Sequence, residues 1–119
     1  AWNGAGPSSW SSDACFRYTL GQLPATPGGL TPSGGIRTSA YPVKLDFGDA
    51  ARATQYEIYV QVWNGSAWQY YGTFRPTVSY YNLYSPWRGT GVVKAWRWKV
   101  RAWNGWGSSS WSNWAEFVN

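Results

Sequence analysis

The chain has 119 residues, enough for one domain, and its 44% apolar and 13% charged residues exclude a disordered polymer. Because there is no histidine and only one cysteine, the usual acyl-transfer triads, a zinc site and a disulfide within the chain are excluded as well. The net charge of +5 permits binding to polyanions but does not by itself indicate it.

The first eighteen residues repeat the last eighteen. Residues 1–18 align with 102–119 without a gap, and 11 of the 18 positions are identical. The shift of 101 positions matches the length of one β-sandwich domain with its linker. Residues 1–18 are therefore interpreted as a partial repeat, a copy of a closing turn and strand. The predicted inter-subunit residues are Trp2, Trp10, Cys15 and Phe16.

A closing strand without its own sheet leaves three interpretations open. Residues 1–18 are the trimmed end of a longer tandem array, a strand donated to a neighbouring subunit, or a strand that folds back onto an edge of its own domain. Cys15 aligns with Glu116, an outward position of the last strand. An intermolecular disulfide and an inert thiol are the two alternatives for this cysteine.

The rest of the chain reads as β structure. Residues 19–35 are rich in proline and glycine, which predicts a linker and a first edge. Asn64-Gly65 favours a tight hairpin, and turn residues recur every 8–12 positions, as in a sandwich over residues 36–119. Alternating or β-branched and aromatic patterns predict strands over 40–47, 55–63, 67–74, 77–84, 92–103 and 108–118.

The segment WRWKVRAWN (96–104), followed by Gly107 and Trp111-Ser112, carries the pattern aromatic-x-apolar-basic-Val-x-Ala-x-Asn. With it the chain resembles the fibronectin type III superfamily over about residues 24–118. TPSG (31–34) and ATQYEIYV (53–60) are similar to tandem repeats of bacterial surface and secreted proteins, although Asp46-Phe47 departs from their polar-Trp pair. The resemblance implies a seven-stranded antiparallel sandwich, an extracellular or cell-surface location, and a function that seldom involves catalysis.

The long strand near the end of the chain has two different faces. Alternation places Trp96, Trp98, Val100 and Ala102 inward and Arg97, Lys99, Arg101 and Trp103 outward. In the last strand, alternation places Trp111, Asn113, Ala115 and Phe117 inward and Trp114 outward. The strand order of the family brings these outward residues beside those of residues 55–63. The predicted ligand- or partner-binding residues are Tyr59, Trp63, Arg97, Arg101, Trp103 and Trp114.

Two interpretations of this outer face are open. One is an intramolecular ladder of cations stacked on indoles. WSNWA (111–115) resembles the Trp-Ser-x-Trp-Ser element of cytokine-receptor domains, where such a ladder is expected, although Ala115 replaces a backbone-bonding serine. The other is a platform whose rings stack on sugars and whose arginines bind acidic groups.

The acidic residues do not indicate a catalytic or metal-binding site. They are interpreted as turn formers and outer-face residues, so neither a catalytic pair nor a calcium shell is predicted. The chain is accordingly predicted to be no enzyme and to hold no cofactor or metal. The five residues are Asp13, Asp46, Asp49, Glu57 and Glu116.

The first functional hypothesis is a non-catalytic extracellular structural or adhesive repeat. It associates head to tail into a fibre or surface array through residues 1–18 and exposed aromatics. The alternative is a carbohydrate-binding module that uses the Trp/Tyr/Arg face to bind a polysaccharide, including an acidic one because the face is basic. The expected partners are copies of the chain, neighbouring repeats or polysaccharide; no membrane span is predicted, and nucleic acid is the weakest idea.

Overall fold

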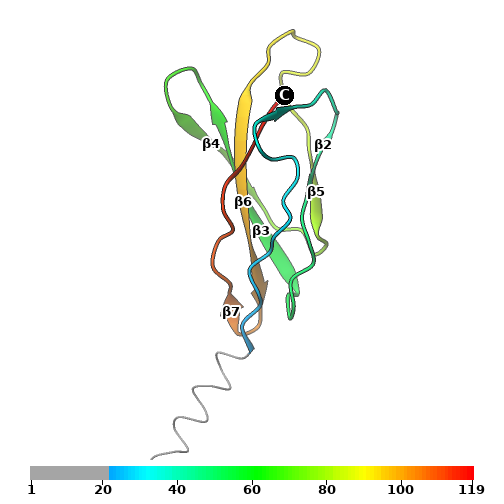
Figure 1. The fold of residues 1–119 in the computed structure, drawn as a ribbon, viewed down its shortest axis with the longest axis vertical. Helices are drawn as coiled ribbons and strands as arrows, with labels where there is room; N and C mark the ends of the chain where they lie inside the picture. The colour runs from blue at the N-terminus through cyan, green and yellow to red at the C-terminus, as the bar shows by residue number, and fades with distance from the viewer. Residues whose placement is uncertain (1–21) are drawn as a thin grey trace, which may run out of the picture.

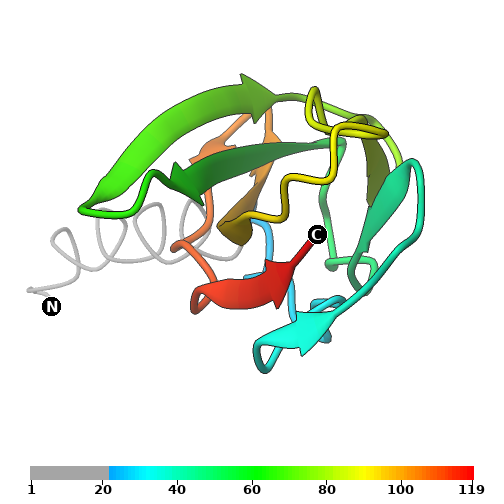
Figure 2. The same cartoon turned by 90° about the horizontal axis from the view of Figure 1, so that it is seen from above.

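The protein is an all-β sandwich of two layers, as the sequence predicts (Figures 1 and 2). A computed structural model describes residues 22–119. The larger sheet has the strand order β1-β8-β6-β3-β4, with β7 paired to β6, and the smaller sheet pairs β2 with β5. The strands are β1 (Ile36–Arg37), β2 (Val43–Asp46), β3 (Gln55–Trp63), β4 (Trp68–Phe74), β5 (Tyr80–Leu83), β6 (Ala95–Asn104), β7 (Gly107–Ser108) and β8 (Ala115–Val118).

Two details differ from the expected seven antiparallel strands. The described residues contain eight strands, because the turn after β6 forms the two-residue strand β7. The pairing of β1 with β8 is parallel, with Ile36 opposite Phe117. The predicted partial repeat of residues 1–18 and its four inter-subunit residues lie outside the described residues.

Strands β3 and β6 form the centre of the larger sheet. They pair antiparallel over eight positions, from Gln55 opposite Trp103 to Val62 opposite Trp96. The alternation predicted for β6 is confirmed, since Trp96 and Trp98 are fully buried. The indole N–H of Trp98 donates to the carbonyl of Pro32 at 3.2 Å, so this buried donor is satisfied.

The core lies between the two layers. In β6 its members alternate with half-buried residues and in β2 with more open ones, which is the period expected of sheets buried on one face. Phe47, just after β2, packs edge-on against Tyr56 with ring centroids 4.8 Å apart. The buried apolar residues are Val43, Leu45, Phe47, Tyr56, Ile58, Val60, Val62, Leu83, Trp96, Trp98, Val100, Ala102, Ala115 and Phe117.

The segment before β1 joins the two layers. Thr31 exchanges two backbone hydrogen bonds with Asp46, at 2.9 and 2.8 Å. The amide of Gly35 donates to the carbonyl of Glu116 at 2.9 Å, on the other layer. The region expected as a linker and first edge therefore covers one open side of the sandwich.

The predicted last strand is regular only at its end. We call residues 109–118 the closing segment; β8 begins at Ala115, and residues 109–114 are not in a strand. The prediction that Trp111 and Asn113 face inward is wrong, because Asn113 is exposed and Trp111 lies on cations of the outer face. Alternation fails here since the segment does not follow a two-residue period.

Candidate functional site

The candidate site is the outer face of β6, where the cross-strand register sets the neighbours. Each cation of β6 lies opposite a polar or aromatic residue of β3: Arg97 opposite Gln61, Lys99 opposite Tyr59, and Arg101 opposite Glu57. Side chains directly opposite one another in an antiparallel pair are close enough to interact. The Nε of Arg97 donates to Gln61 Oε1 at 2.6 Å.

On the other side of β6, two serine hydroxyls hold the closing segment in place of regular strand bonds. The amide of Ala102 donates to Ser109 Oγ at 2.9 Å, and the amide of Val100 donates to Ser112 Oγ at 3.0 Å. The amides of Ser109 and Ser112 return hydrogen bonds to the carbonyls of Ala102 and Val100 at 2.8 and 2.9 Å. Ala115, the first residue of β8, then pairs with Trp98 of β6.

The closing segment therefore advances three residues for every two residues of β6. This three-residue step explains why two indoles three positions apart, Trp111 and Trp114, both lie on the outer face. It also explains why Ala115 needs no hydroxyl, because ordinary strand pairing starts there. Ser109 supplies the second hydroxyl that bonds the backbone, a role that the Trp-Ser-x-Trp-Ser resemblance would give to a serine at position 115.

Four cations and four indoles alternate along this face. Trp111 lies between Lys99 and Arg101, whose charged groups are 4.8 and 4.3 Å from its ring centroid. Trp114 lies in the same way between Arg97 at 4.2 Å and Lys99 at 4.7 Å. We call this set the ladder; in order its members are Trp68, Arg97, Trp114, Lys99, Trp111, Arg101, Trp103 and Arg75.

One carboxylate anchors the end of the ladder. Glu57 is only 8% exposed and accepts hydrogen bonds from Arg101 Nε and Trp103 Nε1, both at 2.8 Å. Arg75 adds an ion pair at 3.5 Å. Burial by itself raises the pKa of Glu57, but these hydrogen bonds and the two guanidinium charges outweigh it and hold the pKa below its ordinary value.

Further rings surround the ladder. Tyr59 lies 5.4 Å from Tyr70, centroid to centroid, and Trp63 packs edge-on against Trp68 at the same distance. Tyr70 is 61% exposed, whereas Trp63 and Trp114 are each 37% exposed. The most exposed of these rings, Tyr70, therefore lies at the rim of the face, whereas Trp114, within the ladder, is as exposed as Trp63.

All six residues predicted for binding lie in this region. Arg97, Arg101, Trp103 and Trp114 belong to the ladder. Tyr59 packs against it at Trp114, and Trp63 reaches it through Trp68. The contacts confirm the interpretation of this face as a ladder of cations stacked on indoles. Ligand binding by the same face stays a prediction.

Sequence reasoning missed the residues that complete the ladder. Glu57 and Trp68 were not assigned to it, although each follows from pairing the outward positions of neighbouring strands. Arg75 follows β4 in a loop, so no alternation pattern identifies it. Trp111 was missed because the three-residue step replaces the expected period of two.

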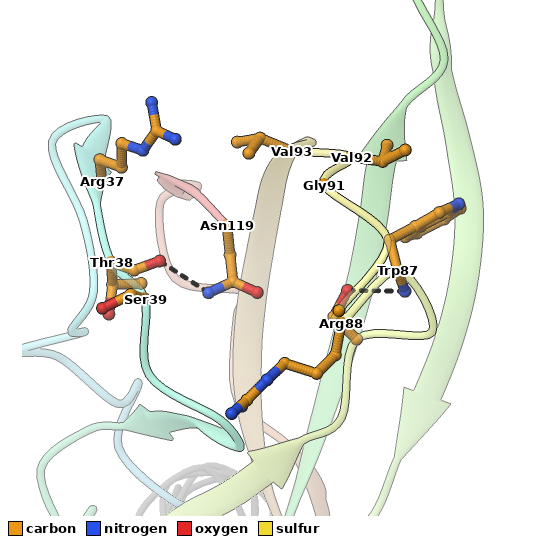
Figure 3. A pocket seen from close by; sticks show the side chains of 11 residues that line it. Arg37, Thr38, Ser39, Trp87, Arg88, Gly91, Val92, Val93 and Asn119 are labelled. Atoms are coloured by element: carbon orange, nitrogen blue, oxygen red, sulfur yellow. Dashed lines mark hydrogen bonds between the residues drawn. The ribbon is translucent and has the colours of Figure 1, made fainter.

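A separate hollow lies near the end of the described chain. Figure 3 shows its two walls, residues 37–39 and residues 85–93, with Asn119 between them. Its volume is about 500 Å³, within the range of small-ligand sites. Asn119 Nδ2 donates to the Thr38 carbonyl at 2.7 Å, and the Asn119 backbone exchanges two hydrogen bonds of 2.9 Å with Lys94, next to the other wall.

The hollow is cationic. Arg37 and Arg88 come from opposite walls, and the Arg88 guanidinium lies 4.4 Å from the Tyr41 ring centroid. Stacking uses the face of a guanidinium and leaves its N–H edges free to bind an anion. Among the residues that the structure describes, no aspartate or glutamate lines this hollow.

Residues 22–119 contain four acidic residues and neither cysteine nor histidine. Within them, no group of three or more cysteine or acidic residues is placed to hold a metal ion. The buried carboxylate Glu57 is fully engaged by the ladder. In the same part of the chain, no helix is long and apolar enough to cross a membrane. The predicted absence of an enzymatic activity stays a prediction.

The strand order, with β1-β8-β6-β3-β4 in one sheet and β2-β5 in the other, defines the chain as a two-layered β-sandwich. No known family model and no curated protein sequence matches it. The solved structures that are similar to it include two of FN3tt. A crystal structure of FN3tt has 19% identity and a TM-score of 0.47, over 82% of this chain and 92% of that one. An FN3tt mutant has 18% identity and a TM-score of 0.45, over 82% and 94%. We base no functional argument on these likenesses.

Proposed function

We propose that the protein is a non-catalytic structural repeat of an extracellular or cell-surface fibre or array, associating with copies of itself or with neighbouring repeats. The observation that carries this proposal is the recurrence of the closing segment at the start of the chain. The repeated part is the one that holds on to β6 through two serines and an indole. A second segment with the same side chains is suited to close a second domain of the same kind.

The chemistry of the ladder supports a structural role. Each of its cations lies against one or two of its indoles, and its acid, Glu57, accepts hydrogen bonds from Arg101 and Trp103. Such a face stiffens the sheet and leaves no nucleophile or general base free to react. The exposed rings at the rim, Trp63 and Tyr70, add apolar surface for adhesion between modules.

Light scattering coupled to size exclusion tests the proposal. The full chain is measured at rising concentration beside a chain lacking residues 1–18. The expected result is a mass that grows with concentration for the full chain and much less for the shortened one. A full chain that stays monomeric at millimolar concentration, with the same mass behaviour as the shortened chain, refutes the proposal.

A second candidate function is the binding of an acidic polysaccharide, and the cationic hollow is the observation that favours it. Titration with oligogalacturonate, a carboxylate-bearing glycan, tests it by calorimetry at low salt. Binding that is lost on Arg37→Gln with Arg88→Gln, but kept on the control Arg52→Gln, supports the candidate. If the unaltered chain gives no heat of binding, the polysaccharide-binding candidate is refuted.

A further inference from the structure

We propose that residues 8–16 of one molecule bind β6 of a second copy in the position of that copy's closing segment. This inference rests on the proposed function and names the acceptor surface and its register. The alignment of residues 1–18 with 102–119 sets the register, so each donor side chain has a defined site on β6.

The serines of the donor match the backbone contacts of β6. Ser8 and Ser11 align with Ser109 and Ser112, the two residues whose hydroxyls accept hydrogen bonds from β6 amides. The donor keeps the three-residue spacing between them. It can therefore make the same three-for-two step along the strand.

The apolar side chains of the donor match the packing. Trp10 aligns with Trp111, the indole held between two cations of β6. Phe16 aligns with Phe117, which is 1% exposed and stacks on Trp96 with centroids 6.1 Å apart. Between them, Ala14 repeats the small buried residue Ala115, 4% exposed, which pairs with Trp98.

The one ladder position that differs is complementary in charge. Asp13 aligns with Trp114, whose ring lies between Arg97 and Lys99 at 4.2 and 4.7 Å. A carboxylate in this place faces two cations that have no described ion-pair partner. Docking of the donor therefore replaces two cation–π contacts with two ion pairs, which salt weakens.

The donor cannot reach this place on its own β6. Asn104 Nδ2 donates to the Gln22 carbonyl at 2.6 Å, which fixes the start of the described chain beside the end of β6. Phe16 would have to lie opposite Trp96, eight residues back along β6 or about 26 Å away. The six residues from Phe16 to Gln22 span at most about 22 Å. This argument excludes the β6 of the donor's own domain, and the proposal therefore commits to a second copy as the acceptor.

An acceptor must first release its own closing segment, so the two segments compete. The acceptor's own segment has the advantage of being tethered, equivalent to a millimolar concentration of a free strand. The donor prevails where the acceptor's own segment is weakened. Such exchange of equivalent elements is a low-cost route to oligomers.

The experiment weakens the acceptor's own segment in the full chain. Phe117→Asp places a charge in the core and disables that segment, while Phe16 remains available on another molecule. The expected result is a folded dimer or larger assembly with the near-ultraviolet circular dichroism of the unaltered chain. The matched control, Phe117→Asp with Phe16→Asp, should lose both the assembly and the signal. A Phe117→Asp chain that stays monomeric with no such signal overturns the inference.

A second measurement remains decisive if the variant chain does not fold alone. A peptide of residues 1–18 is added to the Phe117→Asp chain at low salt, and the return of the tryptophan signal is followed. Asp13→Asn in the peptide should weaken binding about fivefold to tenfold, and added salt should remove most of that difference. No return of signal at millimolar peptide overturns the inference.

The outcomes separate this inference from the proposed function. If the unaltered chain associates but Phe117→Asp is rescued by neither route, association uses other surfaces and the strand exchange is wrong. If the unaltered chain stays monomeric while Phe117→Asp assembles through Phe16, the strand exchange holds and the proposed self-association of the intact module fails.

Discussion

Replacing Trp111 with alanine should destabilise the domain strongly, because this indole connects the closing segment to two cations. Lys99 and Arg101 lie 4.8 and 4.3 Å from its centroid. Each contact contributes about 0.5–1 kcal/mol. The half-buried indole also removes on the order of 100 Å² of apolar surface from water, about 2.5 kcal/mol. The expected loss is about 4 kcal/mol in the free energy of unfolding.

Urea denaturation followed by far-ultraviolet circular dichroism measures this loss, with the linear slope checked for each variant. Trp111→Phe should recover part of it, since phenylalanine keeps a ring but makes a weaker cation–π contact. Trp63→Ala, at the rim and 37% exposed, is the control and should cost less. If Trp111→Ala lowers the free energy of unfolding by less than about 1 kcal/mol, the ladder does not stabilise the domain appreciably.

Three further predictions follow from single contacts. Ser112→Ala leaves a β6 amide without its acceptor and should cost about 1–3 kcal/mol in thermal or urea unfolding, whereas Ser110→Ala should cost little. Glu57→Gln should make the free energy of unfolding less dependent on pH in the acid range. In the wild type the folded-state pKa of Glu57 is lowered, so the ionised carboxylate stabilises the fold above the unfolded pKa of about 4.3. This stabilisation is lost as the pH falls through the folded-state pKa. Gly72→Ala should cost about 1–3 kcal/mol, because its Cβ would lie 2.8 Å from a phenylalanine ring, whereas Gly105→Ala meets no atom within 4 Å.

Each of these has a contradicting outcome. Equal unfolding curves for the Ser112 and Ser110 variants would show that the hydroxyl does not replace a strand bond. A Glu57→Gln profile that keeps the wild-type slope below pH 5 would assign acid sensitivity to other carboxylates. A Gly72→Ala variant as stable as Gly105→Ala would mean that the neighbouring ring moves aside without cost.

The sequence predicts the strands of this fold well where side chains alternate. In β6 the period of two is unbroken, so Trp96 and Trp98 are correctly placed in the core and Arg97 on the outer face. The same period also indicates β3, where Tyr59 and Trp63 take the outward side. Burial of one face of a sheet imposes this pattern directly, which is why it can be read from one sequence.

Prediction fails where side chains take over the role of backbone partners. In residues 109–114 the serine hydroxyls set the step, and no count of apolar residues reveals that Trp111 turns outward. Glu57 illustrates a second limit, because one of its ion-pair partners, Arg75, reaches it from a loop. Contacts from loops depend on three-dimensional placement rather than on the period of any strand.

The opposite placement of Gln22 and Asn119 has a mechanical consequence (Figure 1). A pull between these two points runs along β6 and slides β8 past it. The stacked rings and serine hydrogen bonds between β6 and the closing segment then bear the force at the same time. They do not break one after another. A domain built in this way should resist tension along its long axis far better than tension applied across it.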